Sequence, residues 1–322
     1  YHRSRIKRLR RFKMALNISA ARTIFQDKLD QLMVEELTSG FMEANAGDVI
    51  YTGGSEIKIP SIVMDGLKDY SRADGYPTGG VTLSYQTVKM TMDRGEGFML
   101  DAMDVEETNF LASASTVLGE FQRTKVVPEV DAYRYSKIHG IVKDKAASNV
   151  RAETTALTEK TIYKAIANDI ASVRDEIGES NELVVIINGI ARGLLNNNET
   201  FTKMLTQADF VKGEITTKIR TIDECPIIAV PSSRMFTEYD FFKGSESSGQ
   251  KDGFKKKSTA KQINYIVMPR KAAIAVCKQD APKIITPELN QKADAWFIGY
   301  RKYHDLWIKE SNIGAIRIST EA

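Results

Sequence analysis

The feature that most constrains the fold is a pair of alternating segments separated by a long stretch of turn-forming residues. Residues 55–61 and 81–91 each alternate apolar with polar side chains, which is typical of strands. The residues between them include DGLKDYSRADGYPTGG at 65–80. A loop of this length is unusual inside a compact domain. We therefore predict a two-stranded arm with a flexible tip. Because an isolated two-stranded ribbon is only marginally stable in water, the arm is expected to need a partner surface.

A long helical pattern follows the expected arm. Asp104 and Glu107 resemble a capping box at its start, and apolar residues then recur at helical spacing. Pro128 interrupts the pattern, and Glu129 suits the first turn of a second helix. We predict a helical rod of about 35 residues and roughly 50 Å, kinked or broken at Pro128. Its expected core positions are Leu111, Val117, Leu118, Phe121, Pro128 and Tyr133.

Helical and strand patterns alternate beyond the rod. Residues 158–177 carry isoleucine and valine on one face, with Thr158 as the expected N-cap and Gly178 as the expected C-cap. Residues 183–187 predict a buried strand followed by a short helix. The closing part of the chain predicts strands at 263–268, 272–278, 295–308 and 315–319. The fold class expected from these patterns is α+β.

Composition excludes several classes of protein. The longest aliphatic run has five residues, whereas a membrane-spanning helix needs about 20, so no membrane span is predicted. Cys225 and Cys277 are too few for a disulfide framework or a four-thiolate metal site. Three histidines far apart in the sequence leave little for metal binding or acid–base catalysis. We expect a soluble protein of a reducing compartment that is not an enzyme, with no catalytic residue, metal or cofactor.

Four short patterns have both a chemical and a structural interpretation. Residues 95–97, Gly-Glu-Gly, match half of a dinucleotide-binding fingerprint, and we interpret them as a turn. His304-Asp305 could bind a metal, and we interpret it as a pair on the surface of a strand. The acidic residues of 101–107 are expected to stabilise a helix N-terminus. The lysine-rich segment 243–261 is expected to be an exposed loop.

The positive charge is concentrated at one end of the sequence. Residues 1–13 hold seven basic residues and no acidic one, which leaves 38 basic and 42 acidic residues in the rest of the chain. These basic side chains could face DNA. Alternatively, Met14 is the natural start, and the preceding residues are a tag or upstream translation. Both interpretations stay open. The seven residues are Arg3, Arg5, Lys7, Arg8, Arg10, Arg11 and Lys13.

The order of these elements resembles the major capsid protein of tailed bacteriophages, the Hong Kong 97-type fold. Three segments carry the resemblance: MDRGEGFMLDAMDVEET at 92–108, FQRTKVVPEVDAYRYSKI at 121–138 and AWFIGYRKYHDLWI at 295–308. Each segment is only moderately specific, and their occurrence in this order supports the resemblance, which runs from about residue 14 to the end.

The resemblance implies a structural protein that assembles into pentamers and hexamers and then into an icosahedral shell around double-stranded DNA. It implies an N-terminal arm over 1–47, an extended loop over 48–98, a peripheral domain over 99–149 and 282–322, and an axial domain over 150–281. The extended loop would lie over a neighbouring subunit. Candidate contact residues at its tip are Lys68, Asp69, Tyr70, Arg72, Asp74 and Tyr76.

The same resemblance implies partners. They are further copies of the chain, a portal protein, the packaged DNA and a separate scaffolding protein, because the scaffolding extension of some family members is absent from this sequence. Assembly in the bacterial cytoplasm is expected, with no membrane. Some family members crosslink through a lysine. Lys58, Lys68 and Lys89 are candidates here, but no motif selects one, and crosslinking is not expected.

Two other functions stay open at this point. The first is a cellular nanocompartment shell of the same fold, which encloses a cargo enzyme instead of a genome. The second is a monomeric nucleic-acid-binding protein that acts through residues 1–13. The contents of a purified particle would separate the first from a phage capsid. The second predicts strongly salt-dependent DNA binding and no assembly.

Overall fold

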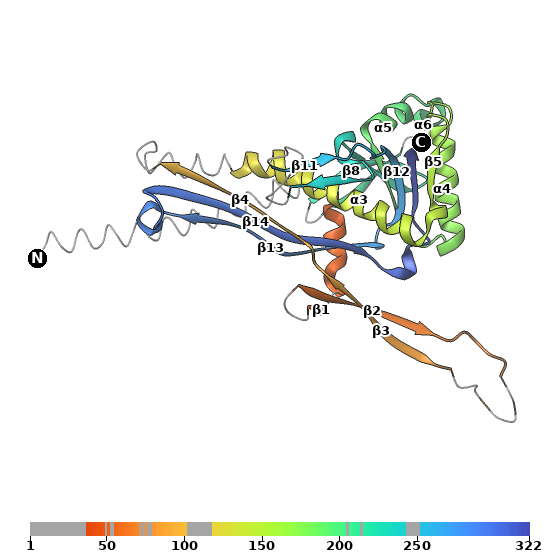
Figure 1. The fold of residues 1–322 in the computed structure, drawn as a ribbon. Coiled ribbons are helices and arrows are strands. Elements are labelled where there is room, and N and C mark those ends of the chain that lie inside the picture. The colour runs from red at the N-terminus through yellow and green to blue at the C-terminus, as the bar shows by residue number, and fades with distance from the viewer. Residues whose placement is uncertain are drawn as a thin grey trace, which may run out of the picture.

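The structure, a computed structural model, describes most of the 322-residue chain. The described residues are 37–48, 50–51, 55–70, 72, 75, 79–101, 118–203, 206–212, 215–242 and 252–322. The basic segment, the first part of the expected rod and residues 243–251 lie outside them. Figure 1 shows a body of sheet and helices from which a narrow hairpin and a long three-stranded sheet extend.

A seven-stranded sheet forms the centre of the body, with the strand order β5-β15-β12-β6-β9-β8-β7. Strand β6 lies in the middle, parallel to β9 and antiparallel to β12, and all six of its residues are buried. This confirms the buried strand predicted from 183–187. The strands are β5 (Val150–Glu153), β6 (Leu183–Asn188), β7 (Thr206–Lys212), β8 (Ile215–Ile222), β9 (Cys225–Val230), β12 (Ile263–Pro269) and β15 (Arg317–Glu321).

Alternating residues of β6 contribute to two separate cores. Val184 and Ile186 pack in the core that includes Tyr135 and Ile138 of helix α3 (Val127–Lys145). Their neighbours along the strand pack instead in the core that includes the apolar face of helix α4 (Ile162–Ile177). The two helices therefore cover opposite faces of the sheet.

Helix α4 has the predicted apolar face, but it begins later than predicted. Thr161 is at the N-cap, and the carbonyl of Thr158 accepts the N–H groups of Thr161 and Ile162 in the turn that precedes the helix. The prediction of Thr158 as N-cap is therefore wrong. The predicted C-cap at Gly178 is confirmed, since its φ of 87° favours glycine.

Two short helices follow β6, where the sequence predicted one. Helix α5 (Gly189–Asn196) begins at Asn188, whose side chain accepts the N–H of Ala191 at 2.6 Å. Helix α6 (Glu199–Lys203) comes next, and the N–H of Phe201 donates to the side chain of Asn198. In both places an asparagine satisfies a backbone donor of a helix start that has no partner within the helix.

The expected rod is continuous through Pro128. Residues 118–121 are helical, Gln122–Val126 (η2) form a π turn, and α3 follows with Pro128 in its first turn. Proline has no N–H, and its ring would clash with the carbonyl four residues before it. The wider turn relieves that clash, and the N–H of Val127 donates to the carbonyl of Gln122, five residues back. The helix is thus distorted next to Pro128 but not broken there.

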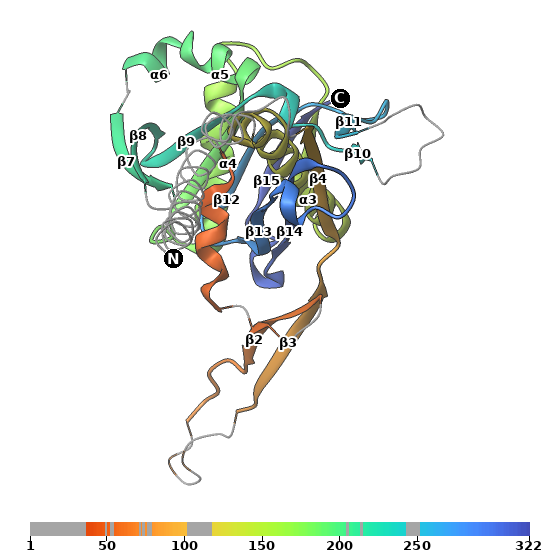
Figure 2. The ribbon, with the colours of Figure 1, turned by 90° about the vertical axis from the view of Figure 1, so that its left-hand side faces the viewer.

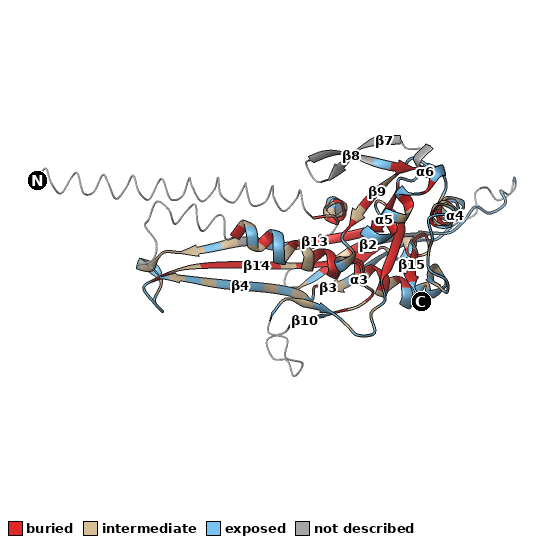
Figure 3. Ribbon diagram, turned by 90° about the horizontal axis from the view of Figure 1, so that it is seen from above, coloured by how far each residue is buried: buried red, intermediate tan, exposed pale blue. Residues whose placement is uncertain are grey.

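The long sheet has three antiparallel strands in the order β13-β14-β4. They are β4 (Met92–Asp101), β13 (Ala273–Ile285) and β14 (Ala295–Ile308), and β13 extends beyond the predicted 272–278. In Figure 3, β14 is the buried central strand, with the more exposed β4 beside it.

The interpretation of Gly-Glu-Gly at 95–97 as a turn is wrong. These residues lie in the middle of β4, where Gly97 is directly opposite Gly299. A Cβ on Gly97 would approach the ring of Phe297 to 2.7 Å, and one on Gly299 would approach it to 2.9 Å. The two glycines therefore make room for an aromatic ring that lies across the strands.

Two further interpretations need correction. His304 and Asp305 are not on a strand surface, because both are buried in β14. Within the lysine-rich segment, Phe254–Lys256 (β11) pairs with Tyr239–Phe241 (β10) and is not a loop. The ring of Phe254 packs against Tyr239 at 5.5 Å between centroids, which gives this short strand a hydrophobic anchor.

The predicted arm is confirmed as a hairpin of β2 (Glu56–Met64) and β3 (Val81–Lys89). The two residues of β1 (Ile50–Tyr51) add a third strand at its base. A 3₁₀ helix, η1 (Gly40–Asp48), precedes it and packs against β13. Figure 2 shows the hairpin projecting away from the body, and the far part of the hairpin consists of β2 and β3 alone.

Phe121 provides a test of how the helical rod packs on the three-stranded sheet. Its ring is half-buried and lies edge-on to Phe98 at 5.1 Å and to Tyr300 at 6.2 Å between centroids. Because the ring is only half-buried, Phe121→Ala should lower the free energy of unfolding by about 2 kcal/mol. The same substitution at a fully buried phenylalanine would lower it by about 3–5 kcal/mol. Denaturant unfolding measures the change. Phe121→Leu is the control and should lower the free energy of unfolding by less. A denaturation midpoint of Phe121→Ala equal to that of the wild type would contradict this packing.

Candidate assembly surface

The base of the arm packs on the body through one of its two faces. Residues opposite each other in an antiparallel pair lie on the same face, which places Ile57 with Val88 and Ile59 with Gln86. Ile57 and Ile59 are buried in a cluster that includes Trp307 of β14. Near the body, therefore, this face of the hairpin is the covered one.

The far part of the arm is apolar on the opposite face. Side chains alternate along a strand, so Val81, Leu83 and Tyr85 lie on the face that Ile57 and Ile59 do not use. Met64 pairs with Val81 and shares this face. We call these four residues the arm stripe. They are 68% (Met64), 70% (Val81), 55% (Leu83) and 47% (Tyr85) exposed.

This change of face leaves a second apolar surface on the arm, separate from the one that packs on the body. A hairpin that packed only on its own body would keep its apolar side toward that body along its whole length. Beyond Ile59 the four exposed apolar side chains of the arm stripe lie on the other face, and the described part of the chain leaves them uncovered. A continuous exposed apolar surface of this kind marks an interaction site.

The predicted contact residues at the tip fall into two groups. Lys68, Asp69, Tyr70 and Arg72 are exposed beyond the ends of the two strands, whereas Asp74 and Tyr76 lie outside the described residues. Lys68 is 3.4 Å from Asp65, and both side chains are about half exposed, so this ion pair is worth about 0–1 kcal/mol.

Asp65 closes the base of the tip, a role that the sequence did not reveal. Its N–H donates to the carbonyl of Gly80 at 3.1 Å, and its carboxylate accepts the N–H of Gly80 at 2.9 Å. These bonds continue the β2–β3 ladder by one residue beyond Met64 and Val81. Leu67, just past Asp65, is fully exposed and adds to the apolar surface of the arm.

A second exposed apolar group lies at the far end of the three-stranded sheet. Met99 of β4 is 53% exposed, and it pairs with Phe297 near the start of β14. Leu289, 73% exposed, lies in the short 3₁₀ helix η5 (Pro287–Leu289) that connects β13 to β14 at the same end. Figure 1 shows that this end and the tip of the arm point away from each other.

The structure describes four of the six expected core positions of the rod. Leu118 is fully buried, Tyr133 is nearly so, and Phe121 and Pro128 are half-buried. The other two, Leu111 and Val117, lie outside the described residues, as do all seven basic residues of 1–13. Their roles stay predictions.

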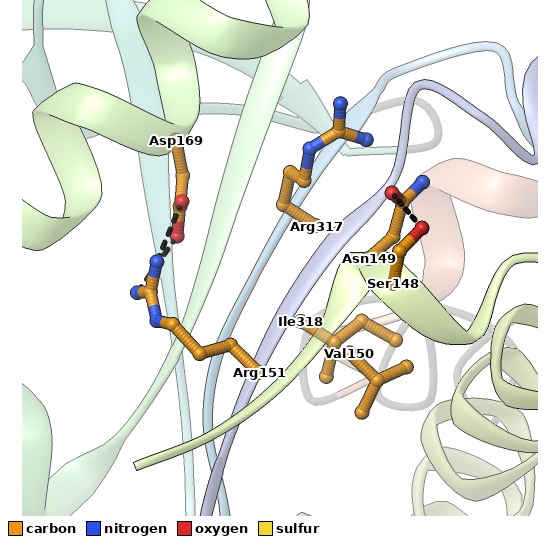
Figure 4. Close-up of a pocket in the computed structure, with 7 residues that line it drawn as sticks. All are labelled: Ser148, Asn149, Val150, Arg151, Asp169, Arg317 and Ile318. Atoms are coloured by element: carbon orange, nitrogen blue, oxygen red, sulfur yellow. Dashed lines mark hydrogen bonds and ion pairs between the residues drawn. The ribbon is translucent and has the colours of Figure 1, made fainter.

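One pocket of about 340 Å³ lies beside β5 (Figure 4). Two arginines line it, but both already pair with carboxylates. Arg151 reaches the two carboxylate oxygens of Asp169 at 3.0 and 3.1 Å, and Arg317 reaches Glu176 at 2.8 Å. The charge that would attract an anion is therefore neutralised, and we assign no ligand to this pocket.

The described residues offer little for catalysis or metal binding. They contain no group of three or more His, Cys, Asp or Glu side chains that could hold a metal ion. Burial raises the pKa of both thiols, Cys225 and Cys277, which disfavours the reactive thiolate. The helices in this part of the chain are too short or too polar to cross a bilayer.

Comparison with known proteins identifies the fold. Neither a protein-family model nor a curated protein matches the chain. The chain is similar to the capsid structure of the cyanophage P-SCSP1u, with a TM-score of 0.55 and 9% identity over 84% of this chain and 85% of that one. Other similar structures are a virus-like particle from Pyrococcus furiosus (TM-score 0.48, 11% identity, 91% and 98% covered) and the mature capsid of bacteriophage PhiM1 (0.48, 10%, 85% and 84%).

At 9% identity, the similarity to the cyanophage structure shows the fold alone. The described chain has the fold of a phage capsid protein, so the predicted α+β capsid fold is confirmed. The boundaries of the four parts expected from the resemblance stay a prediction.

The thiol of Cys277 gives a pH-dependent test of its half-buried position. Burial raises its pKa to about 11, so at neutral pH almost all of it is the unreactive thiol. Its alkylation rate should rise about tenfold for each pH unit up to about pH 10, because the thiolate fraction does. Mass spectrometry after iodoacetamide treatment measures the rate, with Cys277→Ser as the control. Rapid alkylation near neutral pH would contradict the buried position.

Proposed function

We propose that this chain is the major capsid protein of a tailed bacteriophage, a subunit that assembles into pentamers and hexamers and then into a closed shell around double-stranded DNA. The observation that carries the proposal is the arm stripe on a chain with the capsid fold. The stripe consists of four large side chains on one face of a projecting hairpin, and a second copy of the chain is the partner that would cover them.

The proposed receiving surface is the far end of the three-stranded sheet of a neighbouring copy, around Met99 and Leu289. Both surfaces are apolar and exposed. Because they lie on different projections of the subunit that point away from each other, the contact joins two different patches on two copies. Such a head-to-tail contact generates a ring when the rotation between copies closes, which is the arrangement that pentamers and hexamers require.

The expected strength of one contact is modest. Full burial of a large apolar side chain contributes about 1.5–3 kcal/mol relative to exposure. The stripe residues are already one-third to one-half covered, so each would contribute about 1 kcal/mol. A few kcal/mol per contact suits a shell in which every subunit repeats it, since weak single contacts allow wrongly placed subunits to dissociate.

A charge on the arm stripe should block assembly without unfolding the subunit. Leu83→Lys places an ammonium group in the proposed contact, while the side chain remains in water in the single chain. Circular dichroism and thermal unfolding should match the wild type, whereas sedimentation and electron microscopy should show no rings or shells.

The matched control for this substitution is Thr82→Lys, which is also exposed but lies on the opposite face of the same strand. It adds the same charge and should assemble normally. Equal loss of assembly in both variants would contradict the stripe as the contact face. Wild-type chain that stays monomeric at varied salt and crowding, with and without a co-expressed scaffolding protein, would contradict the capsid function itself.

Removal of the tip separates its role from that of the stripe. Deleting residues 66–79 joins Asp65 to Gly80, and Asp-Gly is a favourable two-residue hairpin turn between the paired Met64 and Val81. The shortened subunit should fold with wild-type circular dichroism and form rings that fail to build stable shells, because the predicted tip contacts are lost. Unfolding of this variant would place the tip in the folded core, and normal shells would exclude the tip as a contact.

The other two functions are outcomes of the same experiments. A nanocompartment would form particles that contain one enzyme and no DNA, whereas the proposed capsid encloses DNA and carries a portal protein. A monomeric nucleic-acid-binding protein would remain monomeric and bind DNA with strong salt dependence through residues 1–13. Mass spectrometry and nuclease digestion of the purified particles distinguish these results.

A further inference from the structure

The arm is joined to the body at a short root, Met90–Thr91, between β3 and β4. There the chain leaves the arm and enters the three-stranded sheet. The N–H of Met90 donates to the carbonyl of Ser55 at 2.8 Å, and the hydroxyl of Tyr303 donates to the carbonyl of Met90 at 3.2 Å. Met90 itself is buried with Trp307. The root is thus held firmly, in contrast to the exposed arm beyond it.

One buried carboxylate connects this root to helix α3. Oδ2 of Asp305 accepts both the N–H and the hydroxyl of Thr91, at 2.9 and 3.0 Å. Oδ1 of the same side chain accepts the hydroxyl of Tyr133 at 2.6 Å and the ammonium group of Lys137, and both of these residues belong to α3. One oxygen therefore holds the arm, and the other holds the helix.

The buried charge of Asp305 requires a counter-charge and hydrogen-bond donors. Asp305 is 0% exposed, and a buried charge is tolerated only when it is paired and hydrogen-bonded. Lys137 supplies the charge, and its ammonium group lies 5.3 Å from the ring centroids of both Tyr133 and Trp307. If Thr91 moved away, Oδ2 would lose both of these hydrogen bonds.

We infer that Asp305 is a positioning residue that fixes the direction of the arm relative to α3 and β14. The consequence for assembly rests on the proposed function. Where the arm contacts the next copy, a fixed arm direction sets the rotation between copies, and a loosened root allows a range of rotations. The inference about arm direction itself concerns the single subunit.

The test measures the arm direction with two spin labels. One label is placed at Thr82 on the arm and one at Lys143 on α3, both of which are exposed, in the full-length chain with Cys225→Ser and Cys277→Ser. Double electron–electron resonance on unassembled subunits should give a narrow distance distribution. Asp305→Asn should broaden it, because an amide group cannot accept hydrogen bonds at both of its edges.

A matched control is available in Asp131 of α3. It is also 0% exposed, and it accepts the N–H and hydroxyl groups of Thr38 and Ser39 and a guanidinium N–H of Arg234, none of which belongs to the arm root. Asp131→Asn should destabilise the subunit yet leave the distance distribution narrow. Equal broadening in both variants would overturn the inference, because it would show general loosening only.

A second pair of variants applies if Asp305→Asn fails to fold. Thr91→Val removes one of the two bonds to Oδ2 and should broaden the distribution partly, while Thr91→Ser keeps both bonds and should restore it. An unchanged distribution in Thr91→Val and Asp305→Asn would overturn the inference even if wild-type shells form. Broadening in a chain that never assembles would support the inference and contradict the proposed function.

Discussion

Helix α3 is buried on two sides. One side packs on the seven-stranded sheet, and the other holds the N-terminal segment and β14 through buried polar contacts. Its apolar side, with Tyr135, Ile138 and Val142, packs on the seven-stranded sheet. Its other side carries charged residues that are also buried, so each must find a partner in the element that covers it. Asp131 binds residues 38–39, just before η1, together with Arg234. These pairings attach the N-terminal segment to the helix, as Asp305 attaches the arm root.

The buried network on this side is ionic and suits a structural role. Lys302 of β14, 2% exposed, pairs with Asp280 of β13, which also accepts the hydroxyl of Tyr300. His304 lies among these groups, and its burial, together with the positive charges of Arg134 and Lys302, holds its pKa well below the ordinary value. The imidazole is therefore neutral at physiological pH, and its position resembles a packed core residue more than an acid–base catalyst.

Local patterns in the sequence predicted those elements whose state depends on their own residues. The aliphatic run of β6, the isoleucine face of α4 and the two alternating strands of the arm all formed as predicted. Local patterns did not predict the environment of residues that pack against a segment far away in the sequence. Gly97 looks like a turn residue until the ring of Phe297, two hundred positions later, is placed beside it. His304-Asp305 looks exposed until a helix is known to cover β14.

Local patterns were also insufficient to predict the candidate assembly surface. Alternation predicted that Val81, Leu83 and Tyr85 share a face, but only the register of β2 with β3 shows that this face is opposite to that of Ile57 and Ile59. Register is set by the whole hairpin and by its packing on the body. The change of face, which is the strongest sign of a second partner, was therefore invisible in the sequence.

An exposed apolar stripe is a liability for a single chain, because it favours any association that covers it. A head-to-tail contact gives a closed ring at one set of rotations and an open filament at others, although the buried residues are the same. The apolar side chains of the stripe supply attraction but little direction, since hydrophobic burial is not directional. The direction of the arm is therefore set at the root. There the hydrogen bonds to Asp305 weaken steeply when their distance or angle changes. Under the proposed function, the exposed arm stripe supplies attraction between copies, and the hydrogen bonds of Thr91 and Tyr133 to Asp305 set the direction in which it acts.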